Sequence, residues 1–351
     1  MILQRLSEAI GISGDENAVR AIVLEAIDGL AQDIHIDSLG SVTCRLPAAA
    51  ADEPPLRVLL AAHMDEIGFM VTGFDNDGLI RFAPVGTVDE RILPGKRVVI
   101  GAHALPGVIA WAPIHLNKEQ SVTKLTNLRI DIGASSKEDA QAKVKRGDRI
   151  AFSSRYLELD GGMLRGKAFD DRAGCALLID VLRAGPYPVE VLAAFTVQEE
   201  IGLRGARVVA QALRPDAAFV LETTTAHDVP NPTAEPDDML EENPACRVGA
   251  GPVLTILDRS IIVNPRLLTF LRETAEAASI PYQFKTAPGG GTDAGAIHVA
   301  GGGVPTAVIS LPCRYIHSPS AHLHRDDYEH TLRLVTYALS RLTRAAFEFS
   351  E

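Results

Sequence analysis

The second half of the chain alternates apolar runs with segments of helical periodicity. Three apolar runs are typical of buried strands, and they span 189–197, 217–221 and 305–311. Five segments are predicted to be helices, over 173–183, 205–213, 264–278, 292–299 and 328–347. Strands that alternate with helices favour a parallel arrangement. The pattern therefore predicts an α/β fold with a mixed, mostly parallel sheet that is covered by helices.

The first 67 residues continue this pattern. Ser13 and Glu16 have the spacing of a capping box, which predicts that Ser13 is the N-cap of a helix with apolar positions over 19–27. The apolar run 58–62 is typical of a buried strand and ends at His63. We therefore expect residues 1–67 and 161–351 to form one larger α/β domain.

Residues 68–160 have a different texture, in which short β-like runs are separated by glycine and proline. These runs span 79–82, 97–100, 107–111 and 149–152. One short helix is predicted over 137–144. This stretch therefore predicts a small β-rich domain that is inserted into the larger one.

Composition narrows the class of protein. The 351 residues carry a net charge of −11 and no dense run of lysine or arginine, so nucleic-acid binding is not expected. No apolar run approaches the ~18 residues of a membrane helix, and the N-terminus is typical of an amphipathic helix, not of a signal peptide. We therefore expect a cytoplasmic protein without a membrane partner. The four cysteines are widely spaced, which predicts reduced, buried thiols.

Side chains that can bind metal ions follow several of the predicted strands. These strand-end residues are His63, Asp65, Glu199, Glu200, Glu222 and His317, and Asp170 precedes a predicted helix. In open α/β sheets the ligand crevice lies at the carboxyl ends of the strands. Two imidazoles, a carboxylate able to bridge, further carboxylates and a spare glutamate as base are the inventory of a two-metal hydrolytic site.

Each of these residues also has a simpler explanation when it is taken alone. A single histidine after a strand is more often structural than a metal ligand, and Asp170 with Asp171 could cap a helix. The pair Glu199 and Glu200 is harder to explain in this way, because two adjacent buried carboxylates repel each other unless a cation compensates them. The combination therefore favours a metal site.

Two further segments contain candidate ligand-binding residues. His322 and His324 could replace His317 as a ligand, although their polar segment favours a surface or supporting position. The glycine loop 289–293 lacks the lysine and serine or threonine of a phosphate loop, so nucleotide binding is not expected. A loop that lets the substrate backbone approach closely fits these glycines better.

Five motifs resemble those of the tetrahedral (TET) aminopeptidase family. They are AHMDEIG at 62–68, GKAFDDR at 166–172, QEEIGLRGA at 198–206, GGTDA at 290–294 and RYIHSP at 314–319. The resemblance spans essentially the whole chain. It implies a zinc-exopeptidase-like catalytic domain with a small inserted β-barrel at 68–160 that serves dimerisation.

The resemblance also implies a ligand set for two divalent metal ions. Asp170 would bridge both ions, His63 and Glu222 would complete one site, and Glu200 and His317 would complete the other, although this division could be reversed. Zn²⁺ is the first expectation, and Co²⁺ or Mn²⁺ are alternatives, because histidine and carboxylate sites accept all three. The peptide bond after Asp170 is expected to be cis.

The implied activity is that of an aminopeptidase, which removes N-terminal residues from peptides through a water activated by the two metals. Glu199 would act as the general base, and Asp65 would orient His63 through its second ring nitrogen. A metal-dependent deacylase or deblocking hydrolase of N-acylated amino acids or peptides is the alternative. The family forms dodecamers built from dimers, so we expect a homo-oligomer of the same tetrahedral kind.

Overall fold

A mixed eight-stranded sheet forms the centre of the protein. The computed structural model describes residues 2–49, 54–111, 115, 122–229, 245–285 and 289–349. The strand order is β1-β2-β12-β3-β13-β16-β14-β15. The bounds are β1 Gln32–Ile36, β2 Val42–Leu46, β3 Arg57–His63, β12 Glu190–Thr196, β13 Ala217–Thr225, β14 Val253–Thr255, β15 Gln283–Lys285 and β16 Thr306–Cys313. The four central strands β12, β3, β13 and β16 are parallel, which confirms the predicted mixed, mostly parallel sheet.

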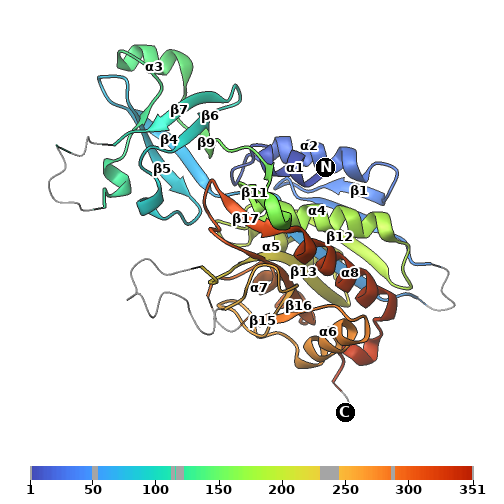
Figure 1. The fold of residues 1–351 in the computed structure, drawn as a ribbon. Coiled ribbons are helices and arrows are strands. Elements are labelled where there is room, and N and C mark those ends of the chain that lie inside the picture. Colours follow the sequence, from blue (N-terminus) through green and yellow to red (C-terminus); the bar gives the residue numbers. More distant parts are fainter. Residues whose placement is uncertain are drawn as a thin grey trace.

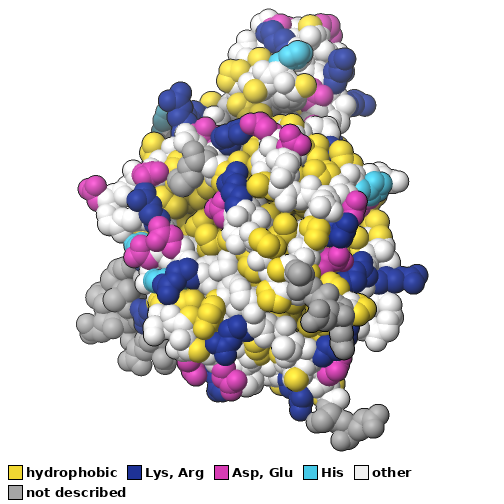
Figure 2. Space-filling model, turned by 90° about the vertical axis from the view of Figure 1, so that its right-hand side faces the viewer, with side chains coloured by type: hydrophobic (Ala, Val, Ile, Leu, Met, Phe, Trp, Pro, Cys, Tyr) yellow, Lys and Arg dark blue, Asp and Glu magenta, His cyan; other side chains and the backbone are white. Residues whose placement is uncertain are grey.

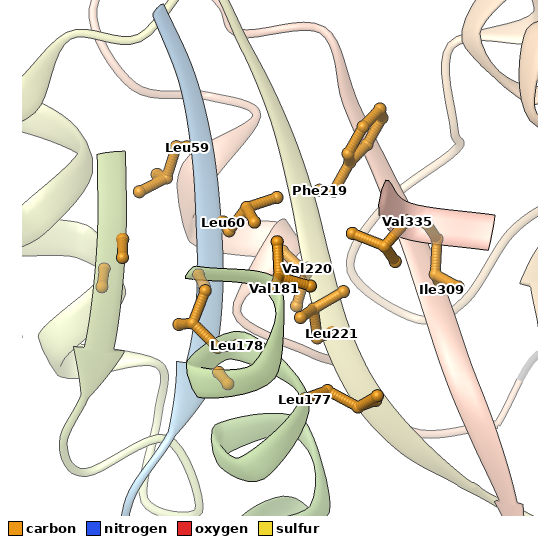
Figure 3. Close-up of a cluster of buried hydrophobic side chains, with 14 of the residues drawn as sticks. Leu59, Leu60, Leu177, Leu178, Val181, Phe219, Val220, Leu221, Ile309 and Val335 are labelled. Carbon is orange, nitrogen blue, oxygen red and sulfur yellow. The ribbon is translucent and has the colours of Figure 1, made fainter. Parts of the chain in front are cut away.

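Helices cover the sheet on both faces (Figure 1). Their bounds are α1 Ile2–Glu8, α2 Asn17–Ile27, α4 Phe169–Ala184, α5 Arg204–Leu213, α6 Pro265–Ala277, α7 Ala294–Ile297 and α8 Arg325–Arg341. Helix α4 packs against β3 and β13 and also contacts α1, α2 and α8, whereas α5 and α7 pack together elsewhere on the sheet. Figure 3 shows Leu178 and Val181 of α4 in the apolar layer between this helix and the sheet. Burial of these side chains is what holds the helix on the strands.

The second unit is a closed six-stranded barrel that projects from the main body (Figures 1 and 2). Its strands are β4 Gly68–Phe74, β5 Ile80–Val85, β6 Arg97–Ile100, β7 Leu105–Ile109, β8 Ile130–Asp131 and β9 Arg149–Phe152, and helix α3 is Lys137–Lys143. Phe69 stands at the centre of the barrel core, with edge-to-face contacts to Phe82 and Phe152 at centroid distances of 5.0 Å and 5.6 Å. The structure thus contains the inserted β-barrel that was expected in addition to the α/β domain.

A small three-stranded sheet lies next to the main sheet. Its strands are β10 Leu157–Glu158, β11 Met163–Gly166 and β17 Ala321–His324. Short 3₁₀ helices span Glu90–Ile92, Leu125–Asn127, Asp160–Gly162 and Arg344–Ala346. Within the described parts of the chain, no helix has both the length and the apolar character that crossing a membrane would take. All four cysteines are buried and unpaired, as predicted.

Two local predictions were wrong. The capping box does not form, because α2 begins only at Asn17 and the Ser13 hydroxyl donates to Asp65 Oδ2 at 2.6 Å instead. The last helix begins three residues earlier than predicted, because the His324 ring accepts the Asp326 N–H as an N-cap, and it ends at Arg341 instead of at 347. Ser13 and His324 therefore both make specific polar contacts that the helical pattern alone does not indicate.

Candidate active site

The topology brings the predicted site residues together at one edge of the sheet. His63 is the last residue of β3, Glu199 and Glu200 follow β12, and Glu222 lies inside β13, which extends beyond its predicted end. Because these strands are parallel neighbours, their carboxyl ends meet. The cavity there has a volume of about 620 Å³. Its lining includes His63, Asp170, Glu199, Glu200, Glu222 and His317.

Asp170 lies between the two histidines and presents one oxygen to each. Its Oδ1 lies 3.1 Å from His63 Nε2, and its Oδ2 lies 3.0 Å from His317 Nε2. Glu222 Oε1 is 3.6 Å from His63 Nε2, and Glu200 Oε1 is 3.3 Å from His317 Nε2. The side chains therefore form two sets that share Asp170, and within each set the candidate ligand atoms lie within 4.8 Å of one another.

Glu199 occupies a different position in the cluster. Its Oε2 is 3.9 Å from His63 Nε2, and with Glu200 it forms a third set that meets the same distance criterion. It belongs to neither set that contains Asp170. Glu199 is therefore the carboxylate that can stay free when the two Asp170-containing sets are filled.

The buried carboxylates of the cluster would be stabilised by additional positive charge. Burial raises the pKa of Glu199 and of Glu222 well above the usual range, and it also raises the pKa of Glu200. Burial would raise the pKa of Asp170 as well, but the hydrogen bonds with His317 and His63 hold it far below its usual value. Glu200 Oε1 is buried and has no hydrogen bond of acceptable geometry within the described structure. This excess of buried carboxylate fits divalent cations, which also match the histidine and carboxylate donor set.

The Asp65 carboxylate contacts several segments that carry site residues. Its Oδ1 accepts the Glu199 N–H at 2.9 Å and lies 3.4 Å from His63 Nδ1, which is 3.1 Å from the Asp65 backbone carbonyl. Its Oδ2 accepts the Ser13 hydroxyl at 2.6 Å and the Glu200 N–H at 3.2 Å. Burial alone would raise the pKa of Asp65, but the hydrogen bond and charge of His63 and the hydrogen bonds from Ser13 and Glu199 lower it. The sequence indicated only the contact with His63, because Ser13 is distant in the chain.

Asp171 also supports the site, which the sequence did not indicate. The Asp170–Asp171 peptide bond is cis, as expected. Asp171 is fully buried, and its carboxylate accepts the His63 N–H at 3.1 Å and the Gly174 N–H at 3.0 Å. A Cβ at Gly174 would come within 2.4 Å of both carboxylate oxygens, so this close approach requires glycine.

The rim of the cavity carries basic groups and the predicted glycine loop. Arg259, Lys285 and residues 289–292 line it. The Arg259 N–H donates to the Gly290 carbonyl at 2.8 Å, and Lys285 Nζ donates to the Gly289 carbonyl at 2.9 Å. These two contacts attach the glycine loop to both neighbouring segments.

The competing histidines lie outside the cavity lining. His324 caps α8, and its Nε2 is 2.8 Å from the Gly161 carbonyl. His322 Nδ1 is 2.9 Å from the Ser320 carbonyl. Neither forms part of a candidate metal set among the described residues, so the structure does not bring them into the site.

A helix-covered mixed sheet with histidines and carboxylates clustered at its strand ends has the features of a metal-dependent hydrolase. The chain belongs to the M42 glutamyl aminopeptidase family, whose model matches residues 40–334. This membership makes the protein an aminopeptidase.

Related proteins and structures cover nearly the whole chain. A TET aminopeptidase structure from the marine sediment archaeon Thaumarchaeota archaeon SCGC AB-539-E09 is 37% identical, with a TM-score of 0.90, and the match covers 98% of this chain and 96% of that one. The Pyrococcus horikoshii TET1 peptidase, which can assemble into a tetrahedron or a large octahedral shell, is 32% identical with a TM-score of 0.85, covering 97% and 99%. A lysyl aminopeptidase from Pyrococcus furiosus is 31% identical over 97% of this chain and 96% of its own length.

Proposed function

We propose that this aminopeptidase holds two divalent cations with His63, Asp170, Glu200, Glu222 and His317, and uses them to remove N-terminal residues from peptides. The observation that carries the proposal is the position of Asp170, whose two oxygens face His63 and His317 separately. A carboxylate shared in this way is what a two-metal hydrolytic site requires. Zn²⁺ is the first candidate, and Co²⁺ or Mn²⁺ would fit the same donors.

Glu199 is the group that moves the proton. Bound cations would supply a water of lowered pKa and polarise the scissile carbonyl. The Glu199 carboxylate takes the proton of the attacking water and passes it to the leaving amine. Asp65 holds this carboxylate in place through the Glu199 N–H and holds the His63 ring at Nδ1.

Hydrolysis of matched peptides tests this proposal. Free and N-acetylated versions of one peptide would be incubated with the protein before chelation, after chelation, and after Zn²⁺, Co²⁺ or Mn²⁺ is added back. We expect cleavage of the free peptide only, loss of cleavage on chelation, and recovery with metal. Cleavage of the acetylated peptide would instead support the deacylase alternative, and cleavage that persists after complete chelation would overturn the metal mechanism.

We further propose that the cavity prefers an acidic N-terminal residue. Arg259 and Lys285 line it, whereas every carboxylate among its described lining residues belongs to the metal cluster. Neither Arg259 nor Lys285 forms an ion pair with a described residue. The family does not decide which N-terminal residue is preferred. It is described as a glutamyl aminopeptidase family, yet one relative is a lysyl aminopeptidase. A basic rim would attract the side-chain carboxylate of glutamate or aspartate.

Aminoacyl-nitroanilides with acidic, basic and apolar residues would measure this preference. Arg259→Ala should lower kcat/KM for the glutamyl substrate by about 10- to 100-fold, because a charged hydrogen bond is lost. Activity on the leucyl substrate should stay within about threefold. Arg146→Ala, an exposed change in the barrel, is the control. Equal loss on both substrates, or a preference for lysyl substrates in the unchanged protein, would contradict the assignment.

We also propose that the inserted domain of residues 68–160, which contains the barrel, acts in dimerisation within a tetrahedral dodecamer. Trp111 just beyond β7 is 59% exposed and Val108 is 37% exposed, so apolar surface is available on the barrel. The assembly of the Pyrococcus horikoshii TET1 peptidase supports the same organisation. Light scattering should give a dodecamer mass for the unchanged chain and smaller species for Trp111→Glu. A monomer in the presence of metal would contradict the proposal.

A further inference from the structure

The N-terminal segment pairs with the chain that follows His63, outside the lining of the cavity. Ile12 pairs with Glu66 in a parallel bridge, in which the Glu66 N–H donates to the Gly11 carbonyl at 2.9 Å. The Gly11 N–H in turn donates to Glu66 Oε1 at 3.2 Å. This pairing places Ser13 beside Asp65, with Ser13 only 2% exposed.

A buried ionic network fixes this segment in place. Lys167 Nζ lies 2.6 Å from Glu66 Oε1, and Arg172 Nη2 lies 3.3 Å from the same oxygen. Arg172 also donates to the carbonyls of Leu6 at 2.6 Å and Gly11 at 3.2 Å. Glu66, Lys167 and Arg172 are each at most 3% exposed. Because Lys167 and Arg172 flank the Asp170–Asp171 pair in the chain, the N-terminal segment is tied to both sides of the metal cluster.

The Ser13 hydroxyl makes the shortest hydrogen bond to Asp65. Without it, Asp65 Oδ2 would keep only the Glu200 N–H at 3.2 Å. Asp65 is fully buried, so water does not replace a lost donor without rearrangement. A less constrained carboxylate would loosen the backbone that carries Glu199, whose N–H it accepts. It would also weaken its 3.4 Å contact with the His63 ring, which lies 3.1 Å from the Asp65 backbone carbonyl as well.

We propose that Ser13 is a positioning residue, whose hydroxyl fixes the Asp65 carboxylate and thereby aligns His63 and the Glu199 backbone. The inference rests on the roles proposed above for His63 and Glu199. Ser13 touches neither the cavity nor a candidate metal ligand among the described residues, so its effect must pass through Asp65. The metal affinity and the rate of the chemical step should therefore respond to this hydroxyl, while substrate binding at the rim should not.

Three substitutions at Ser13 distinguish an effect on the position of the Asp65 carboxylate from a general effect on the stability of the fold. Ser13→Ala removes the donor, Ser13→Cys keeps the size but offers only a weak S–H donor, and Ser13→Thr keeps the hydroxyl. The matched control is Ser7→Ala, because Ser7 is also fully buried and its hydroxyl donates at 2.7 Å, but to the Lys167 carbonyl. Each variant would be measured for kcat, KM, thermal unfolding and Zn²⁺ affinity by calorimetric titration of the chelated protein.

Ser13→Ala and Ser13→Cys should lower kcat or Zn²⁺ affinity by about 10-fold or more, with KM within about twofold. Ser13→Thr should retain most of the kcat and of the Zn²⁺ affinity. Ser7→Ala should lower the unfolding temperature without changing kcat or Zn²⁺ affinity. The cysteine variant carries the test if the alanine variant does not fold. Unchanged kcat and Zn²⁺ affinity in Ser13→Cys, or equal losses in Ser7→Ala, would overturn the proposal. Failure of the unchanged protein to bind Zn²⁺ would overturn the proposed function instead.

Discussion

The barrel and the catalytic body bury different kinds of side chain. Among the described residues of 68–152, every buried position holds an apolar side chain or a glycine. The body buries charged groups as well, including Asp65, Asp171, Glu199 and Glu222 in and around the site. Burying charge costs stability unless it is paired or binds a cation. The body therefore buries charge at a cost in stability that bound cations would offset, whereas the described residues of the barrel carry no such cost.

The backbone shows the same contrast. Ala168, Gln198 and His317 have φ values of 52°, 58° and 57°, a left-handed conformation that is unfavourable for residues other than glycine. Each lies in the site or within two residues of it. Among the non-glycine residues of the described barrel, only Ala104 has such a conformation. Backbone strain is therefore present at the site, as is common at functional sites, although Asp33, Arg214 and Ser279 of the body adopt the same conformation away from it.

Glu199→Gln gives the largest expected difference between the two regions. It should lower kcat by about 10²- to 10⁴-fold, because the proton acceptor is lost, while metal binding is retained. Glu138→Gln changes an exposed glutamate of α3 in the barrel in the same way and should leave kcat unchanged. Steady-state kinetics together with metal analysis would check both, and near-normal activity of Glu199→Gln would show that the base is another group.

Phe69→Ala is the converse change, made in the barrel core. Phe69 is fully buried against Phe82 and Phe152, so its loss should destabilise the protein by about 3–5 kcal/mol. Denaturant unfolding would measure this loss. The kcat per folded molecule should stay close to the original value, and a large fall in kcat at full folding would mean that the barrel core shapes the site directly.

Glu222→Gln should stabilise the protein when metal has been removed. Burial holds the pKa of Glu222 well above its usual range, so the ionised form opposes folding at neutral pH. The neutral amide should add about 0.5–2 kcal/mol at pH 7. This gain should vanish as the pH falls below the ordinary pKa of glutamate, because Glu222 is then protonated in both the folded and the unfolded state.

Chemical denaturation of chelated protein at several pH values measures this effect. Glu329→Gln, an exposed change on α8, is the control and should show no gain. With metal restored, the unchanged protein should be the more stable of the two, because the Glu222→Gln variant lacks a metal ligand. A loss of stability in the chelated Glu222→Gln protein would contradict the view that this carboxylate is held at a cost.

The sequence predicted the sheet and the six cluster residues because both depend on local patterns. Apolar runs show where strands end, and residues just beyond parallel strands meet at one edge. The predicted runs 97–100 and 149–152 coincide with β6 and β9. Contacts between distant segments were not predictable in this way. Ser13 has the spacing of a helix cap, yet its hydroxyl is taken by Asp65, and no local rule anticipates that partner.

The number of bound metal ions tests directly whether two ions share Asp170. Chelated protein and its Asp170→Asn variant would each be titrated with Zn²⁺ in a calorimeter, and the bound metal would be counted by elemental analysis. We predict two ions per chain in the unchanged protein, and fewer than two in Asp170→Asn, because the shared carboxylate is lost. One ion or none in the unchanged protein, or two ions of undiminished affinity in Asp170→Asn, would contradict the account.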